Sequence, residues 1–283
     1  MSQSNTSSKL HKSLLLAFCL IVFTQMPRLL ILFGLIGFFI KYRFNKETVN
    51  VDEKCEKVSK RQKNSDSDFI SFSSLTNHYH DKVKDFINNP DSKQKHIVQE
   101  KLDGSNFSIR MNDSNEIIFC SRNRVLNGQF HNYESVVPDL SKYAENIFNE
   151  FGNSVYIFGE LMGCGYMDLP VKRKNSRFQN KVEYTNDLVF ISYDIYNSKT
   201  KTYINSSIAL DALTNAGFLV SPVLATYDSL EEALTHDEVF SSTIPELLGM
   251  PKHNLKNEAE GIVIRPMGKD YYINEDRGIF KKK

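Results

Sequence analysis

The stretch Glu100-Lys101-Leu102-Asp103-Gly104-Ser105-Asn106-Phe107 decides the fold of this chain. It places Lys101 directly before an Asp-Gly turn, and the residues that follow, up to Met111, alternate between polar and apolar as in a strand. A lysine held at such a turn can face a bound phosphate. If it is desolvated or lies beside other cations, it can also lose its proton and act as a nucleophile.

The surrounding sequence predicts a mixture of strands and helices. Residues 116–120 form a short apolar strand that pairs with residues 107–111 across a turn-rich connection. Further strands are predicted at residues 155–158, 188–196 and 261–265, a helix from Pro138 to Gly152, and another helix at the capping box 229–232. Strands outnumber helices and many neighbours are antiparallel, so the predicted class is α+β.

Length and composition divide the chain into three parts. We expect an N-terminal tail at residues 1–46, a polar linker at 47–68 and one globular domain at 69–283. The net charge of +1 provides no global field for nucleic acid, so any such binding must use a local patch. The four cysteines are widely spaced, which argues against a zinc module or a disulfide framework and favours a reducing, intracellular compartment.

The N-terminal tail carries an apolar segment from Leu14 to Ile40. Its eighteen Leu, Ile, Phe and Val residues outweigh the single Arg28, at roughly −0.3 to −0.6 kcal/mol each against about +3 kcal/mol. The segment is therefore expected to associate with a membrane, as one tilted span or as a hairpin. The alternatives are an organellar (mitochondrial) presequence, since residues 1–46 contain no acid, a buried hydrophobic hairpin, or a wrongly assigned start codon.

Six segments follow one another in an order that resembles the ATP-dependent RNA ligases of the RNA ligase 2 and editing-ligase type, a branch of the covalent nucleotidyltransferases. They are EKLDGSNF (100–107), CSRNR (120–124), YIFGE (156–160), FISYDI (190–195), EAEGIVIRP (258–266) and FKKK (280–283). The segment FSSLTNHY (72–79) also resembles the first residues of the family. The resemblance covers residues 69–283. It implies an ATP-grasp-like nucleotidyltransferase (adenylation) domain with antiparallel sheets around an ATP cleft, preceded here by the hydrophobic N-terminal segment.

The resemblance also implies a reaction. Lys101 would attack the α-phosphate of ATP and expel pyrophosphate, leaving AMP on its Nζ. The AMP would pass to an RNA 5′-phosphate, and a 3′-hydroxyl would displace it to seal the strand. Mg2+ would be the cofactor. An unperturbed lysine titrates near 10.4, so Mg2+ and the terminal lysines would have to favour the neutral amine by like charge.

The resemblance assigns roles to particular residues. The catalytic residues would be Lys101 as nucleophile, with Lys281 and Lys283 holding the α-phosphate. ATP would be bound by Glu100, Arg122, Glu160, Tyr193 and Glu260, of which Glu260 would also hold the metal. Contacts with RNA or phosphate would come from Asn106, Arg124 and Arg265.

Several of these assignments have competing interpretations. The terminal lysines could form a disordered tail, and Tyr193 could be a core aromatic residue. Glu258 competes with Glu260 for the metal, and Arg122 is favoured over Arg124 for the ATP phosphates. Arg265 stands where the family often has lysine, and we expect it to pair with a carboxylate or a phosphate. The basic stretch at residues 172–181 is either a solvated loop or a track for RNA phosphates.

Two departures from the family pattern affect the expected partners. No residues follow Lys283, so we expect a protein partner to supply what a C-terminal domain supplies in the family. The apolar tail is also not a usual family feature. The rival interpretations are a DNA ligase, a capping-type nucleotidyltransferase, and a membrane-tethered, catalytically impaired protein that binds nucleotide or RNA. The Ser-Asn-Phe sequence after the Asp-Gly turn favours the RNA ligase branch.

We predict that residues 1–46, fused to a fluorescent reporter, anchor the reporter to a membrane, because the apolar residues of this tail outweigh its one internal charge. The measurement is carbonate extraction of a membrane fraction. The anchored reporter stays in the pellet, whereas a reporter released into the supernatant would exclude the anchor.

Overall fold

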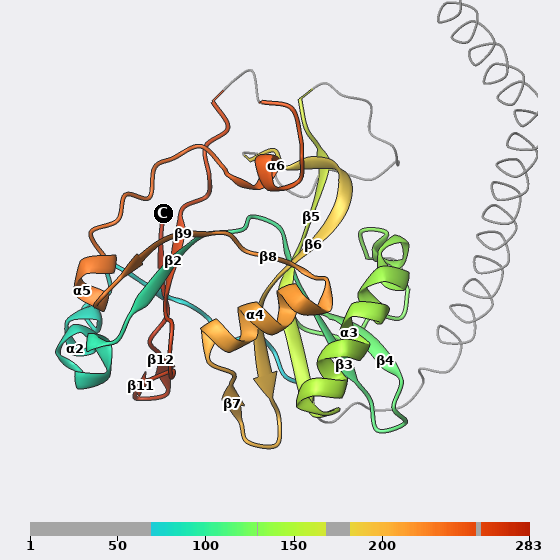
Figure 1. Ribbon diagram of the computed structural model, residues 1–283, viewed down its shortest axis with the longest axis horizontal. Coiled ribbons are helices and arrows are strands. Elements are labelled where there is room, and N and C mark those ends of the chain that lie inside the picture. Colours follow the sequence, from blue (N-terminus) through green and yellow to red (C-terminus); the bar gives the residue numbers. More distant parts are fainter. Residues whose placement is uncertain (1–68, 129, 168–181, 253–255) are drawn as a thin grey trace, which may run out of the picture. The chain divides into compact units, whose positions relative to one another are not determined.

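The computed structural model describes residues 69–128, 130–167, 182–252 and 256–283 (Figure 1). The expected apolar segment at 14–40, the linker at 47–68 and the basic stretch at 172–181 lie outside the described residues. Among the helices of the described residues, none has both the length and the apolar character needed to cross a membrane.

Two main sheets form the framework. The first sheet has the order β1 (Thr76–Asn77), β13 (Phe280–Lys282), β10 (Ile262–Pro266), β2 (His96–Glu100) and β9 (Val223–Tyr227). The second has the order β4 (Ile117–Ser121), β3 (Ser105–Met111), β5 (Val155–Gly165), β6 (Thr185–Asn197) and β7 (Thr202–Tyr203), with β8 (Leu219–Val220) also on β6. A hairpin joins β11 (Tyr272–Ile273) and β12 (Asp276–Arg277).

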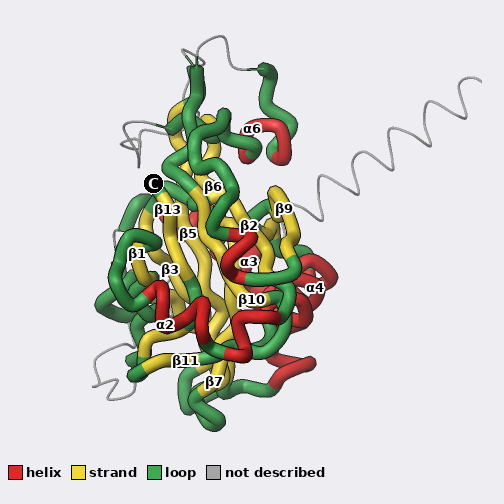
Figure 2. The backbone as a smooth tube through the Cα atoms, turned by 90° about the vertical axis from the view of Figure 1, so that its left-hand side faces the viewer, coloured by secondary structure: helices red, strands yellow, loops and turns green. Residues whose placement is uncertain are grey.

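Most strand pairs in both sheets are antiparallel. The two exceptions in the described residues are the short parallel pairs β1–β13 and β6–β8. The predicted α+β class with antiparallel sheets is therefore confirmed. Figure 2 shows the strands of both sheets running through the body of the described unit, with helices on their outer sides.

Each sheet is covered by its own helices (Figure 1). The helices are α2 (Val83–Asn88), α3 (Val137–Phe151), α4 (Ser206–Ala216), α5 (Leu230–Ala233) and α6 (Ile244–Leu247), with 3-10 turns at Pro90–Lys93 and Tyr133–Ser135. Helices α3 and α4 share one apolar core with the second sheet. Helices α2 and α5 share another with the first sheet. The burial of these apolar faces holds the layers together.

The predicted hairpin at residues 107–120 is confirmed by the pairing of β3 with β4. Phe107 lies opposite Ser121, and Met111 lies opposite Ile117. The turn is closed by Asn112, whose Oδ1 accepts hydrogen bonds from the backbone N–H of Ser114 and Glu116 at 3.0 and 2.8 Å. A local side-chain bond of this kind is how asparagine stabilises a turn.

Two other predicted strands are longer in the structure. Strand β5 extends to Gly165 and β6 begins at Thr185, because the two form a long antiparallel hairpin. The predicted strand ends at Phe158, directly before Gly159, and glycine is disfavoured in strands. The structure explains the glycine: a Cβ there would overlap the ring of Phe190 on β6. The close packing of the two strands thus requires glycine at position 159, although glycine is not typical of a strand.

The predicted helices are confirmed as well. Pro138 lies in the first turn of α3, and the helix ends at Gly152, whose φ of 84° suits glycine. At the start of α5, Ser229 accepts a hydrogen bond from the N–H of Glu232 at 3.2 Å. The carboxylate of Glu232 reaches the N–H of Asp228 instead of that of Ser229, so the capping box is closed one residue early.

A buried ion network joins the two sheets. Asp194 on β6 is fully buried and accepts hydrogen bonds from Arg277 at 2.6 Å and from Arg265 on β10 at 3.4 Å. Arg277 also donates to Asp270 at 2.6 Å, and its guanidinium lies 3.5 Å from the ring centroid of Tyr203. Removing one partner of such a network leaves uncompensated charge in the interior.

We predict that Asp194→Asn lowers the free energy of unfolding by about 3–5 kcal/mol, because two buried arginines lose their shared carboxylate. The measurement is urea denaturation followed by circular dichroism. The matched control is Asp276→Asn, which breaks the exposed pair with Lys82 and should cost at most about 1 kcal/mol. Equal losses in the two variants would contradict the role given to the network.

Candidate active site

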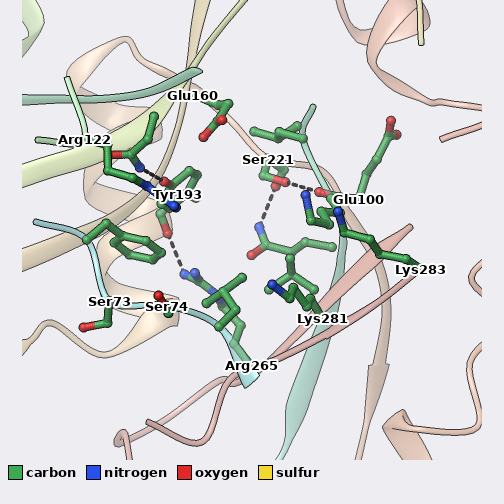
Figure 3. A pocket seen from close by; sticks show the side chains of 17 residues that line it. Ser73, Ser74, Glu100, Arg122, Glu160, Tyr193, Ser221, Arg265, Lys281 and Lys283 are labelled. Carbon is green, nitrogen blue, oxygen red and sulfur yellow. Dashed lines mark hydrogen bonds between the residues drawn. The ribbon is translucent and has the colours of Figure 1, made fainter. Parts of the chain in front are cut away.

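A pocket of about 190 Å³ lies where the two sheets meet (Figure 3). The first sheet contributes residues of β2, β10 and the C-terminal strand, and the second contributes residues of β3, β5 and β6. Residues 72–75, which precede β1, close one side. In Figure 3, Glu160 and Arg122 lie on one side of the pocket, and Lys281 and Lys283 on the other.

One carboxylate joins two lysines at the edge of this pocket. The Nζ of Lys101 donates to Oε2 of Glu260, and the Nζ of Lys283 donates to Oε1 of the same residue. The backbone N–H of Lys101 also donates to the carbonyl of Gly261 at 2.9 Å. Partial burial opposes ionisation of Glu260, but the hydrogen bonds from both lysines hold its pKa below the ordinary value. The lysine predicted as nucleophile thus lies beside the acid predicted as metal ligand.

Two of the three terminal lysines lie in strand β13, and Lys283 directly follows it, so this segment is not a disordered tail. Lys281 pairs with Val263 and Lys282 with Ile262 on β10. Since side chains alternate along a strand, Lys281 and Lys283 face the pocket while Lys282 points to the opposite face. Desolvation, together with the nearby charges of Lys283 and Lys101, lowers the pKa of Lys281. Among the described residues, no carboxylate forms an ion pair with Lys281.

Glu160 faces these cations from the second sheet. It lies on β5 opposite Asn106 on β3. Burial of its carboxyl group raises its pKa to about 8, even though Lys101 and Arg122 favour the charged form. Without ligand, burial therefore favours the protonated form of Glu160. A protonated carboxyl can both donate and accept a hydrogen bond, and it can therefore pair with the hydroxyls of a ribose, which also donate and accept.

The two arginines after β4 are placed differently. Arg122 lines the pocket, and the backbone carbonyl of Arg124 closes the loop by accepting from the N–H of Ser121 at 2.9 Å. Arg124 does not line the pocket. The placement agrees with the preference for Arg122 at the phosphates, and the RNA contact of Arg124 stays a prediction.

Two other predicted site residues contact Tyr193. Asn106 donates to the hydroxyl of Tyr193 at 2.7 Å, and Arg265 donates to its carbonyl at 2.6 Å. The ring of Phe72 meets the ring of Tyr193 edge-on, with centroids 5.0 Å apart. Arg265 was expected to pair with a carboxylate or a phosphate. It is 1% exposed and pairs with the carboxylate of Asp194. Its contact with an RNA phosphate stays a prediction.

Glu100 lines the pocket, but its carboxylate is engaged inside the protein. It accepts hydrogen bonds from the Oγ of Ser242 at 2.6 Å and from the N–H and Oγ1 of Thr243 at 2.7 and 2.8 Å. Desolvation outweighs these bonds and raises the pKa of Glu100. The predicted contact of Glu100 with ATP stays a prediction, and the structure adds a second role for this residue as the acceptor of hydrogen bonds from Ser242 and Thr243.

The residues predicted as metal ligands are separated by the structure. Glu258 forms an exposed pair with Lys256 at 2.6 Å, whereas Glu260 lies between two pocket lysines. Among the described residues, no group of three or more His, Cys, Asp or Glu could hold a metal ion. Mg2+ commonly uses one or two carboxylates together with waters and substrate phosphates. Glu260 fits a metal of that kind, shared with a bound nucleotide.

Two parts of the pocket were missed as site residues. Ser221 donates to the carbonyl of Glu100 at 3.1 Å, and its own carbonyl accepts from Gln99 at 2.7 Å. Residues 72–75 were noted for their resemblance but were given no place in the site. Nothing in the sequence marks Ser221, since it reaches β2 across 121 positions of chain.

The fold and the pocket define a class of protein. The model of the RNA ligase family matches residues 94–283, and the chain belongs to this family. Two solved structures of Naegleria gruberi RNA ligase variants share the fold: an apo form (TM-score 0.51, 20% identity) and one with AMP and Mn (TM-score 0.52, 19% identity). Each match covers 75% of this chain and 55% of the solved chain.

A curated relative comes from a virus. Protein Early 65 kDa of Autographa californica nuclear polyhedrosis virus is 34% identical over 129 residues, which cover 44% of this chain and 22% of the viral protein. The chain therefore spans about half of the solved ligases that it matches and less than a quarter of this relative.

We predict that Glu160→Gln makes the ligand-free protein less sensitive to pH. The carboxyl titrates near 4.5 when unfolded and near 8 when folded, so the wild type loses stability as pH rises between these values. Relative to the wild type, Glu160→Gln should gain stability from pH 5 to pH 8, by up to a few kcal/mol at about 1.4 kcal/mol per pKa unit.

The measurement is the free energy of unfolding from urea titrations at both pH values. The exposed Glu145→Gln on α3 is the matched control and should follow the wild type. A difference between Glu160→Gln and the wild type that is the same at pH 5 and pH 8 would contradict the raised pKa.

Proposed function

We propose that this protein is an ATP-dependent RNA ligase that forms a lysyl-AMP at Lys101 and joins RNA 5′-phosphate to 3′-hydroxyl ends. The observation that carries the proposal is the meeting of Lys101, Glu260 and Lys283 at the edge of a pocket lined by Lys281 and Glu160. The family membership of the chain supports the same function. The Naegleria ligase solved with AMP and Mn supports a nucleotide and a divalent metal as its ligands.

ATP would bind with its adenine against Tyr193 and its ribose hydroxyls on Glu160. An aromatic ring offers stacking energy of about 1–3 kcal/mol to a base. The triphosphate would extend toward Lys281, Lys283 and Arg122, the cations of the pocket. A metal bound by Glu260 would neutralise charge on the phosphates.

Lys101 must be neutral before it can attack. In the ligand-free site its Nζ donates a hydrogen bond to the carboxylate of Glu260. A metal held by Glu260 would draw this carboxylate away from Lys101, and the like charge of the nearby Lys281 and Lys283 would then favour the neutral amine. Its Nζ then forms a bond to the α-phosphorus, the bond to the β-phosphate oxygen breaks, and pyrophosphate leaves.

Sealing would follow in two further transfers. The RNA 5′-phosphate takes AMP from Lys101, and the 3′-hydroxyl then attacks that phosphate and expels AMP. Asn106, Arg122 and Arg124 are proposed to contact the RNA phosphates, and the basic stretch at residues 172–181 to extend this track. We also propose that the protein is intracellular, that residues 14–40 attach it to a membrane and that it acts with a protein partner.

We predict that the wild type becomes labelled covalently by ATP carrying a radioactive α-phosphate, in the presence of Mg2+ or Mn2+. Lys101→Ala should abolish the label because the nucleophile is gone, and Glu260→Ala should abolish it because the metal ligand is gone. Glu258→Ala is the matched control and should label like the wild type, since Glu258 pairs with Lys256 at the surface. A wild type without label under either metal would refute the proposal.

The same assay separates the related enzymes. An excess of unlabelled ATP should suppress the label and an excess of GTP should not, which distinguishes a ligase from a capping-type enzyme. The adenylated protein should then seal nicked RNA in preference to nicked DNA. Sealing of nicked DNA alone would assign the protein to the DNA ligases.

A further inference from the structure

Residues 236–243, which connect α5 to α6 and are called here the brace segment, contact three of the elements that carry the charged groups of the site. No residue of the brace segment lines the pocket. The segment follows the short helix α5, whose Leu230 and Ala233 are fully buried against the first sheet. Its contacts therefore affect the site through the elements that carry the charged groups, and not through the pocket itself.

The first contact is with the C-terminal strand. The Nζ of Lys282 donates to the carbonyl of His236 at 2.7 Å and pairs with the carboxylate of Glu238 at 2.8 Å. The side chain of Lys282 is only 14% exposed. Its hydrogen bond to Glu238 contributes to the lowered pKa of that carboxyl. The residue between the two pocket lysines is thus fixed to the brace segment.

The second contact is with the residues that lead into Glu260. The backbone N–H of Ala259 donates to the carbonyl of Phe240 at 2.9 Å, and the N–H of Ser242 donates to the carbonyl of Asn257 at 2.8 Å. These backbone bonds continue the isolated bridge between Ser241 and Glu258. They fix the backbone that leads into Glu260, whose carboxylate contacts two lysines.

The third contact is with the end of β2. Ser242 and Thr243 give three hydrogen bonds to the carboxylate of Glu100, which directly precedes Lys101. That carboxylate is buried, with Glu100 1% exposed. Loss of these donors would leave a buried acceptor without hydrogen bonds, which is destabilising. The contact therefore constrains the position of Glu100.

The brace segment is itself anchored at its start. The Nδ1 of His236 lies 2.8 Å from the hydroxyl of Tyr227 on β9, and the backbone N–H of His236 donates to the carbonyl of Ala233 at 3.2 Å. The brace segment therefore ties β13 to the far edge of the first sheet, three strands away.

Strand β13 needs such a support. It has only three residues, of which two pair with β1. At Gly261, φ is +138° and a Cβ would overlap the carbonyl of Lys282, so β13 passes close to the backbone beside Glu260. A small shift of β13 would then move both Lys281 and Lys283 away from their places at the pocket.

We propose that the brace segment is a positioning device, which holds Lys101, Glu260 and the pocket lysines in reactive register through Lys282 and Glu100 without touching the nucleotide. The inference rests on the proposed function for the reaction that it affects. Lys282 acts through its neighbours and not on the phosphates, because its ammonium lies on the opposite face of β13.

The test is Lys282→Met, which keeps most of the side-chain length and removes its bonds to His236 and Glu238. In single-turnover assays the rate of lysyl-AMP formation should fall about 10- to 100-fold, the cost of a small misplacement of reacting groups. The KM for ATP should change much less, because Tyr193 and Glu160 do not contact the brace segment. Lys282→Arg, which can donate to both partners, should restore most of the rate.

The matched control is Lys82→Met, which removes an exposed ion pair with Asp276 and should leave the rate unchanged. Thermal melting separates positioning from unfolding: a loss of rate explained by the unfolded fraction would overturn the proposal. If Lys282→Met does not fold, Glu238→Gln and Thr243→Val decide. Thr243→Val should slow the reaction by weakening the hold on Glu100, and wild-type rates in both variants would overturn the proposal.

A second readout does not depend on activity. Hydrogen exchange at the backbone amides of residues 280–283 should be faster in Lys282→Met than in the wild type and in Lys82→Met. If the wild type forms no lysyl-AMP, the proposed function fails, and exchange alone still tests the brace. Unchanged exchange together with an unchanged rate would refute the inference.

Discussion

The pairing of β10 with two neighbours at once is the constraint on which the site depends. Ile262 lies opposite Glu100 on β2 and opposite Lys282 on β13. Neighbouring strands are about 4.8 Å apart. The residue after Glu100 and the two residues that flank Lys282 therefore lie near Glu260, which precedes β10. A slip of β13 by one residue would turn Lys282 into the pocket and both other lysines out of it. The register of three strands thus decides which ammonium groups meet Glu260.

The charges of the pocket suit a polyphosphate. Lys101, Arg122, Lys281 and Lys283 are gathered from distant parts of a chain whose net charge is only +1. Glu260 neutralises part of this charge, while burial raises the pKa of Glu160 to about 8 and so favours its uncharged form. Among the residues that line the ligand-free pocket, cationic side chains therefore outnumber carboxylates. Desolvation, followed by this crowding of like charge, lowers the pKa of Lys281, and a bound phosphate would favour its charged form.

The sequence was most informative where structure is local. The β3–β4 hairpin and helix α3 follow from turn residues, alternation and caps within a dozen or so positions, and both were predicted. The partners of Glu100 could not be predicted, because Ser242 and Thr243 are about 140 positions away. Strand β13 has the composition of a solvated tail and becomes a strand through its pairing with β10. The motif resemblance placed Lys101, Glu160 and Glu260 near each other, since it carries long-range information that propensity lacks.

Arginine at position 265, where the resemblance leads one to expect lysine, follows from the geometry of the sheet junction. One guanidinium nitrogen donates to the carbonyl of Tyr193 at 2.6 Å, and the other lies 3.4 Å from Asp194. The planar fork serves two acceptors that a single ammonium could not reach in the same way. Tyr193 lines the pocket, and Asp194 joins the sheets. The wall of the pocket and the contact between the sheets therefore share a side chain, so a change that loosens the sheet junction also shifts the wall expected to hold the adenine.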